Sequence, residues 1–204
     1  MPSETFTAFF YGTLLHPSIL RRVIGHHGTH LQICPALLPH EDYPGVIPYA
    51  KSQHLFAGRD LSPEERTVRG TLVSGLTTRD IELLDIFEGD EYSRESVLVH
   101  PLGSFTPLSE ASLPNSSVIP TTAPPLPPLS SLAQPIPAQT YIWIHPLNEM
   151  KPELWEYDEF VRTNSWKWLG RSAAEDNYVE VDRRRDMNGV IVRREVQAVE
   201  VGAV

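Results

Sequence analysis

The hydrophobic pattern along the chain alternates between strand-type and helix-type segments. An aromatic run from Phe6 to Tyr11 stops at Gly12, which predicts a strand followed by a loop. Further strands are expected at residues 31–38, 68–73, 92–100 and 139–145. Two helices are expected between them, at residues 17–24 and 77–88. The first has a proline in its first turn and ends at Gly25, and the second begins with a Thr77-x-x-Asp80 sequence that resembles a capping box.

This pattern is interrupted between Pro101 and Pro137, where 10 of the 19 prolines fall and Glu110 is the only charged residue. Such a composition favours an extended or disordered segment, and we expect a surface insertion to which no function is assigned. The strands on either side, 92–100 and 139–145, are predicted to pair as neighbours.

The chain after residue 150 carries one further helical pattern. Leu154, Tyr157, Val161 and Trp168 fall on one face of a helix predicted from Pro152 to Leu169, with Gly170 as its stop. The tail contains three consecutive arginines at residues 183–185, whose positive charge is largely offset by the neighbouring aspartates. It also contains Asn188-Gly189, a pair typical of a tight turn. A hairpin and a frayed helical extension both fit this tail. We therefore expect one domain at residues 1–170, with an insertion at about 101–138, and a C-terminal extension at 171–204.

Composition narrows the class of protein. The 204 residues are 41% hydrophobic, enough for one core, and 26 acidic residues against 17 basic ones give a formal charge of -9. This acidic balance argues against a nucleic-acid partner. The single cysteine, Cys34, is expected to be a buried structural residue in an intracellular, cytoplasmic protein. No signal peptide or membrane-spanning run is recognisable.

Several kinds of site are excluded by inspection. The sequence has no phosphate-binding loop, dinucleotide-binding glycine pattern, GxSxG elbow or CxxC motif. None of its eight histidines forms the spaced pair of a zinc hydrolase, and residues 26–30, which contain three of them, are expected to be a solvated loop. We expect no metal site.

Two segments remain as candidates. In the first, the predicted strand gives way at Tyr11-Gly12-Thr13-Leu14 to a loop and then a helix. Successive backbone N–H groups in such a turn can hold an anion, and Gly12 would let a ligand approach the backbone closely. A glycine turn after a core strand is the structural alternative.

The second candidate is Glu88, at the end of the predicted helix 77–88. On a helical wheel it follows Ile81 and Leu84 on the apolar face, so its carboxylate is expected to be partly desolvated. Desolvation and the negative end of the helix dipole both favour the protonated form, which suits proton transfer near neutral pH. A surface glutamate at a frayed helix end is the structural alternative.

Together these segments resemble the gamma-glutamylcyclotransferase superfamily, in particular its AIG2-like branch with gamma-glutamylamine cyclotransferase. The resemblance rests on Tyr11-Gly12-Thr13-Leu14, on Leu84-Asp85-Ile86-Phe87-Glu88-Gly89 with Tyr92-x-Arg94, and on Val68-Arg69-Gly70-Thr71-Leu72. It spans about residues 6–170 and leaves out the proline-rich insertion and the tail.

The resemblance implies an α+β fold, a mixed β-barrel with flanking helices, and a cavity at its mouth that needs no cofactor or metal. It also implies a small-molecule substrate: a γ-glutamyl amide whose α-amine attacks its own γ-carbonyl, releasing 5-oxoproline and a free amine. Glu88 would be the general acid/base. The backbone of Gly12, Thr13 and Leu14 would bind the substrate carboxylate or carbonyl, and Tyr11 and Tyr92 would line the cavity.

Two other functions fit the same residues. One is a different cyclisation or isomerisation of a small molecule that also depends on Glu88. The other is a non-catalytic binding protein that presents residues 124–128, Pro-Pro-Leu-Pro-Pro, as a recognition segment. The oligomeric state is left open.

Overall fold

The computed structural model describes residues 4–39, 41–42, 47–48, 60–63, 65–111, 118 and 124–146. The predicted helix 152–169, the arginine triplet and the Asn188-Gly189 turn lie outside these residues, as does the proposed extension 171–204.

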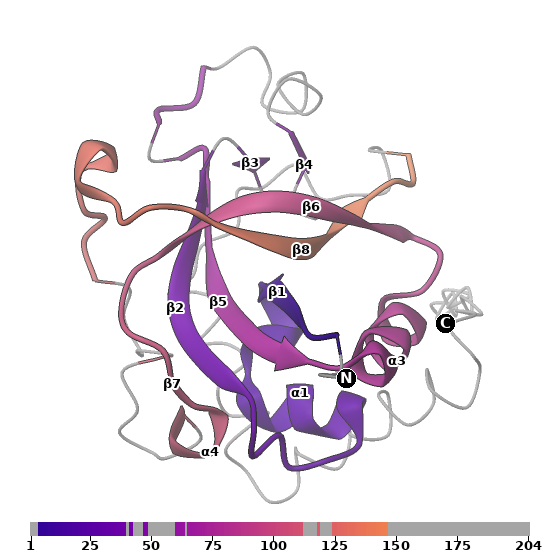
Figure 1. Ribbon diagram of the computed structural model, residues 1–204. Coiled ribbons are helices and arrows are strands. Elements are labelled where there is room, and N and C mark those ends of the chain that lie inside the picture. Colours follow the sequence, from indigo (N-terminus) through magenta and orange to yellow (C-terminus); the bar gives the residue numbers. More distant parts are fainter. Residues whose placement is uncertain are drawn as a thin grey trace, which may run out of the picture.

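Five strands form a closed barrel. They are β1 (Phe6–Phe10), β2 (Gln32–Pro39), β5 (Thr67–Leu76), β6 (Tyr92–Pro101) and β8 (Ile136–Trp143). The order is β5-β1-β8-β6-β2, and pairing of β2 with β5 closes the ring (Figure 1). The barrel is mixed because β1 runs parallel to β8 while the other neighbours are antiparallel. This confirms the predicted mixed β-barrel, and β6 and β8 pair across the insertion as expected.

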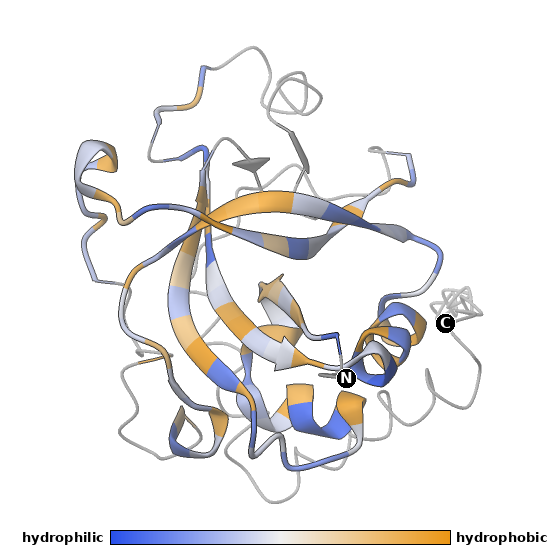
Figure 2. Ribbon diagram, viewed as in Figure 1, coloured by the Kyte–Doolittle hydropathy of each residue, from blue (hydrophilic) through white to orange (hydrophobic). Residues whose placement is uncertain are grey.

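Strand alternation divides the apolar residues into two cores. On β1, Phe9 points into the barrel, while Ala8 and Phe10 point outward to the helices. The interior core holds Phe9, Cys34, Ala36, Leu38, Val68, Leu72, Val99 and Ala138. In Figure 2, β5 carries adjacent apolar residues, as expected for a strand whose two faces are both buried: Leu72 lies in the interior core and Val73 in the outer core. Cys34 is 0% exposed, so the prediction that it is buried is confirmed.

Helices α1 (Pro17–Ile24) and α3 (Thr78–Glu88) begin and end at the predicted signals. The capping box of α3 is formed, since Asp80 N–H donates to Thr77 Oγ1 at 3.2 Å and Thr77 N–H donates to Asp80 Oδ2 at 2.8 Å. The two helices lie side by side against the barrel (Figure 1) and share the outer core with Phe10, Val73 and Tyr141.

The described part of the proline-rich insertion is a surface excursion only in part. No residue of 124–135, which include the 3-10 turn η3 (Leu129–Ser131), is buried, as expected. The first part is anchored instead, since it forms β7 (Thr106–Pro107), which pairs with β2, and then α4 (Leu108–Ala111). Leu108, Ala111 and Val118 are buried in the outer core. Arg21 of α1 also donates to the Leu108 carbonyl at 2.8 Å. A few apolar residues in a weakly charged segment were enough to anchor it.

Two short strands, β3 (Glu41–Asp42) and β4 (Ile47–Pro48), pair with each other apart from the barrel. Among the residues described, no helix combines the length and apolar character that crossing a membrane requires.

Candidate functional site

The predicted glycine turn lies where β1 ends. Tyr11 is still extended, and Gly12, with φ of 60°, opens the 3-10 turn η1 (Gly12–Leu15). A Cβ added at Gly12 would meet no atom within 4 Å, so the positive φ, and not crowding, is what favours glycine here. Leu14 is buried in the outer core and Thr13 is exposed. The side chain of Leu14 is therefore used for packing, and only its backbone could face a substrate.

Tyr11 connects this turn to β8. Its ring packs against the interior core and stacks on Phe9 with ring centroids 6.4 Å apart. Its hydroxyl donates a hydrogen bond to the backbone carbonyl of Tyr141. The position of Tyr11 is thus held by the strand that also carries Tyr141.

Glu88 is the last residue of α3, one residue before Gly89. Ile81 and Leu84 on the same helical face are buried, with exposed fractions of 5% and 0%, and Glu88 is half-buried. The helical-wheel prediction for this carboxylate is therefore confirmed in its burial. Its negative charge is also one of the causes that raise the pKa of Tyr141, which places Glu88 near that phenol.

A hydrogen-bonded network lies beside Glu88. The Tyr141 hydroxyl donates to Asp85 Oδ1 at 2.8 Å. Arg94 holds the same carboxylate with two bonds, Nε to Oδ1 at 2.8 Å and Nη2 to Oδ2 at 3.2 Å. Its Nη1 donates to Gln139 Oε1 at 2.7 Å. Burial, followed by the charge and hydrogen bond of Asp85, raises the pKa of Tyr141, and the positive charge of Arg94 opposes this shift.

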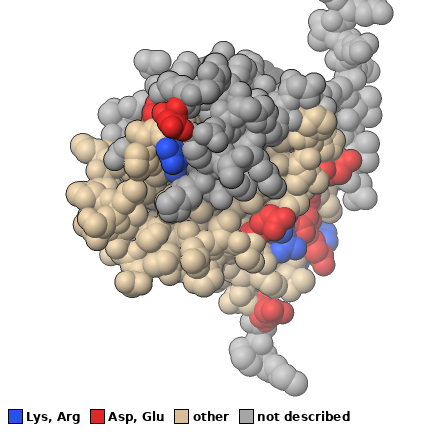
Figure 3. Space-filling view, turned by 90° about the horizontal axis from the view of Figure 1, so that it is seen from above, with Lys and Arg blue, Asp and Glu red and all other residues tan. Residues whose placement is uncertain are grey.

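Strand register explains why these side chains meet. Arg94 of β6 lies opposite Tyr141 of β8, and Gln139 is two residues away on the same face. Asp85 and Glu88 reach this face from α3. On the face of the molecule seen from above, basic side chains likewise lie beside acidic ones (Figure 3).

Tyr92 extends the same face toward the start of β6. It lies opposite Trp143, and the two rings meet edge to face at 5.4 Å. Trp143 in turn contacts His145 at 5.7 Å. Tyr92 is half-buried against the outer core, a position that suits the wall residue predicted from the sequence.

Glu88 and Tyr92 are therefore brought to one region around Tyr141 and Trp143. The Tyr11 ring lies in the interior core instead, and it is linked to this region through its hydrogen bond to the Tyr141 carbonyl. Gln139 and Tyr141 were missed as members of this region, and Asp85 and Arg94 were noted only within the family motif. No signal in local sequence marks Gln139 or Tyr141, since only the pairing of β6 with β8 places them there. A pocket of about 250 Å³, lined by residues of β2, β5 and the insertion, contains none of these residues.

The histidines of residues 26–30 are exposed, as predicted, although His26 Nε2 lies 2.7 Å from Oδ1 of the buried Asp80. Within the described part of the chain, no group of three or more His, Cys, Asp or Glu side chains is arranged to hold a metal ion.

Comparison with known proteins decides the family. The sequence profile described as "Gamma-glutamyl cyclotransferase, AIG2-like" matches residues 8–112, just over half of the chain. The chain belongs to this family. The match includes the three segments on which the resemblance rests: Tyr11–Leu14, Val68–Leu72 and Leu84–Gly89. No curated protein matches the sequence significantly.

Three solved structures are similar to this AIG2-like chain. The solution structure of At5g39720.1 from Arabidopsis thaliana shares 20% identity, covering 83% of this chain and 89% of that one, with a TM-score of 0.46. The solution structure of At3g28950.1 from the same plant shares 16% identity over 98% and 96%, also with a TM-score of 0.46. The crystal structure of a selenomethionine-labelled gamma-glutamyl cyclotransferase specific to glutathione, from yeast, shares 17% identity over 69% of each chain, with a TM-score of 0.41.

Proposed function

We propose that this protein is a gamma-glutamyl cyclotransferase with Glu88 as its general acid/base. The observation that carries the proposal is the family match over residues 8–112, which includes both the Gly12 turn and Glu88. The position of Glu88 adds support, because a half-buried carboxylate on an apolar helical face suits proton transfer better than a solvated one.

In the proposed reaction the substrate's α-ammonium first gives a proton to Glu88, because only the free amine can act as a nucleophile. The amine then attacks the γ-carbonyl carbon, forming the lactam C–N bond. The bond to the original amide nitrogen breaks as Glu88 returns its proton to that nitrogen. Glu88 then takes a second proton from the nitrogen of the new ring and passes it to the departing amine. The products are 5-oxoproline, with one hydrogen on its ring nitrogen, and the amine as its ammonium ion, and Glu88 is a carboxylate again.

The turn at Gly12 is proposed to bind the polar groups of the substrate. The first N–H groups of a helical turn have no partner inside the turn, so they suit a carboxylate or the oxyanion that forms on the γ-carbonyl. We assign this role to the backbone of Gly12, Thr13 and Leu14. Tyr11 and Tyr92 form walls that hold the amine over the carbonyl, and this positioning lowers the entropic part of the barrier.

The test measures release of 5-oxoproline by mass spectrometry from γ-glutamyl amino acids, γ-glutamyl-ε-lysine and glutathione. We expect Glu88→Gln to reduce the rate at least about 100-fold, since general acid/base groups typically contribute factors of this size. Glu82→Gln is the matched control, because Glu82 is an exposed glutamate of the same helix, paired with Arg79. Its rate should stay within about twofold of the wild-type rate.

Absence of 5-oxoproline over the whole panel, with a folded wild-type protein, would reject the cyclotransferase assignment for these substrates. Equal loss of activity in Glu82→Gln would reject the specific role of Glu88.

A further inference from the structure

The proline-rich insertion contains a short segment, Pro124-Pro125-Leu126-Pro127-Pro128, that the proposed reaction does not use. In Figure 1 it runs outside the barrel to the turn η3, which leads into β8. Its two ends are exposed, and only Leu126 and Pro127 are half-buried. Leu129, which follows the segment, is a large apolar residue with an exposed fraction of 37%. The segment is therefore an apolar part of the surface that another molecule can reach.

The sequence of this segment restricts its backbone to an extended helix. Each of its residues either is a proline, which holds φ at about −65°, or precedes a proline, which disfavours the α-helical region. Both restrictions favour the polyproline II helix, with φ of about −75° and ψ of about 145°. Pro128 has φ of −51° and ψ of 132°, and Leu132, beyond η3, has φ of −63° and ψ of 144°. Both residues lie close to the polyproline II values.

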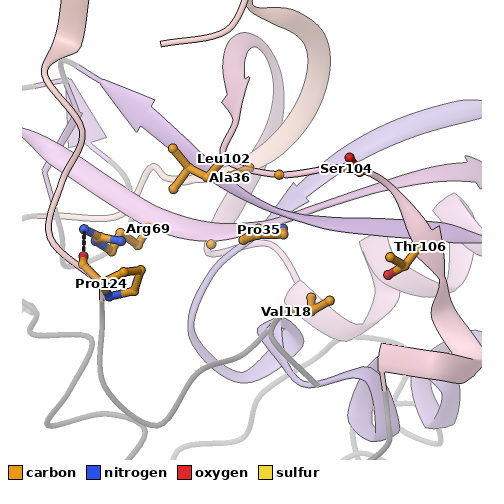
Figure 4. A pocket seen from close by; sticks show the side chains of 10 residues that line it. Pro35, Ala36, Arg69, Leu102, Ser104, Thr106, Val118 and Pro124 are labelled. Carbon is orange, nitrogen blue, oxygen red and sulfur yellow. Dashed lines mark hydrogen bonds between the residues drawn. The ribbon is translucent and has the colours of Figure 1, made fainter. Parts of the chain in front are cut away.

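Hydrogen bonds hold the segment at both ends. Arg69 of β5 donates to the carbonyl of Pro124 (Figure 4). At the other end, the carbonyl of the last residue accepts from the N–H and the Oγ of Ser131, both at 2.8 Å. Beyond η3, His100 Nδ1 of β6 donates to the Ala133 carbonyl at 2.7 Å. The segment is thus fixed before a partner arrives, which lowers the entropic cost of binding.

The middle of the segment keeps its carbonyl groups available. Within the described part of the chain, the carbonyls of Pro125, Leu126 and Pro127 accept no hydrogen bond. Four of the five residues are prolines and have no N–H, so the segment cannot add to a sheet as a paired strand. It offers proline rings and hydrogen-bond acceptors, which are the groups that domains binding polyproline II helices recognise.

The exposed prolines share one side of this helix. A polyproline II helix has three residues per turn, so Pro125 and Pro128 lie on the same edge, and Pro124 lies on the neighbouring edge. All three are exposed. No basic residue flanks them in the sequence, since Glu110 is the only charged residue between positions 101 and 137. This composition favours a groove that reads proline rings alone over one that also reads a basic neighbour, as many SH3 domains do.

We propose that residues 124–128 bind a WW-type domain, a protein partner whose groove holds proline rings between a tryptophan and a tyrosine side chain. Pro124 and Pro125 occupy the groove, and Pro128 contacts the same domain one turn further along. Packing of the rings on aromatic faces buries apolar surface, and side chains of the partner donate to the carbonyls in the middle of the segment. This interaction is independent of the proposed cyclotransferase reaction.

The test titrates an isotope-labelled WW domain that binds Pro-Pro-Leu-Pro peptides with the whole 204-residue chain and follows its NMR signals. We expect saturable one-to-one binding with a dissociation constant of about 100 μM or below, as in transient complexes. A synthetic peptide of residues 124–132 is the comparison, and the chain should bind at least as tightly, because its segment is already held in the extended helix. An SH3 domain whose ligands carry an arginine beside PxxP should bind at least about tenfold more weakly.

Three variants locate the contact. Pro125→Ala and Pro128→Ala should each weaken binding at least about tenfold, since each removes an exposed ring from the same edge. Pro137→Ala is the matched control, because Pro137 is an exposed proline of β8 outside the segment, and it should bind as the wild type does. Circular dichroism of each variant shows whether the barrel is still folded.

The proposal is overturned if the WW domain does not bind the chain, or if Pro125→Ala and Pro128→Ala bind unchanged. It is also overturned if the peptide binds more than about tenfold more tightly than the chain, since the fold would then hide the segment. Tighter binding of the chain by the SH3 domain would reject a WW-type partner. Because binding is measured without turnover, failure of the cyclotransferase assignment leaves this result unaffected.

Discussion

The carboxylate of Asp85 accepts hydrogen bonds from two different strands, from Arg94 on β6 and from Tyr141 on β8. The Tyr141 phenol is buried, and losing its proton would place a second negative charge beside Asp85. Burial is the main reason why the pKa of Tyr141 is raised, and the charges of Asp85 and Glu88 act in the same direction. Tyr141 therefore acts as a fixed hydrogen-bond donor that links α3 to the barrel, while its carbonyl holds Tyr11.

The raised pKa of Tyr141 predicts its behaviour in an alkaline titration followed by tyrosinate absorbance. The chain has seven tyrosines. While the protein stays folded, Tyr141→Phe should titrate with the same amplitude as wild type near pH 10, the ordinary range of tyrosine, because Tyr141 does not ionise there. In denaturant the titration amplitude of the variant should be smaller than that of the wild type by one tyrosine. If the amplitude of the folded variant is already smaller than that of the folded wild type, the proposed environment of Tyr141 is contradicted.

At the scale of elements, helix α1 depends on a histidine cap. His16 precedes Pro17, and its Nδ1 accepts a hydrogen bond from Ser18 N–H at 3.2 Å, which requires an unprotonated ring. Burial lowers the pKa of His16 from 6.5 to about 4. The unfolded chain therefore binds more protons than the folded chain between these two pH values.

This difference predicts a pH-dependent stability of α1 and of the domain. The contribution of His16 is complete above pH 6.5 and is lost as the pH falls toward about 4, with a total of up to about 3 kcal/mol. His16→Asn should remove this part of the pH dependence, since asparagine keeps a cap acceptor and does not titrate. Denaturant unfolding at several pH values measures it. His27→Asn, at an exposed position, is the control, and its free energy of unfolding should change with pH as that of the wild type does. If His16→Asn also keeps the wild-type pH dependence, the assignment to His16 is refuted.

A second prediction at this scale concerns the contact between β1 and β5. A Cβ at Gly70 would lie 2.2 Å from the Phe10 carbonyl oxygen and 2.6 Å from the Phe9 ring, so the strands could not keep their spacing. We expect Gly70→Ala to destabilise the fold by roughly 2 kcal/mol or more, as overpacked cores do. Gly103→Ala is the control, because its Cβ would meet only Pro35 at an ordinary 3.5 Å. Equal unfolding midpoints in urea for the two variants would contradict this packing.

At the scale of the whole molecule, the barrel encloses its one thiol. Cys34 is fully buried in the interior core, and burial raises its pKa to about 11. Both the lack of access and the scarcity of thiolate slow its reactions. The buried residues that pack around Cys34 all come from barrel strands. Exposure of the thiol therefore reports on opening of the barrel itself.

We expect Cys34 to react with an aromatic disulfide reagent only through unfolding. In native buffer the reaction should be far slower than that of a free thiol, and its rate should rise with urea in parallel with loss of the circular dichroism signal. Complete reaction of one thiol per chain in concentrated guanidinium chloride is the control. A native rate close to that of a small thiol would mean that the barrel opens locally at β2.

Local rules in the sequence were sufficient for most elements. The capping box at Thr77 and Asp80, the proline of α1 and the glycine after it each act within one helical turn, and all three lie where they were predicted. Strand β8 begins three residues earlier than expected, at Ile136, because its prolines did not prevent pairing with β6. The anchoring of the insertion was missed, because burial of Leu108 and Val118 depends on a core built by distant residues.

The amino-acid sequence by itself determined the five barrel strands, the helices α1 and α3, the α+β barrel class, the family and the place of Glu88 on an apolar helical face. Periodicity and capping decide these features within a few residues, and the family motifs are short and local. Only the tertiary structure decided how β2 closes the barrel on β5 and which side chains form the hydrogen-bonded network at the end of α3. Asp85, Arg94 and Tyr141 come from three elements, and they meet because strand register and helix docking, which are long-range contacts, bring them together.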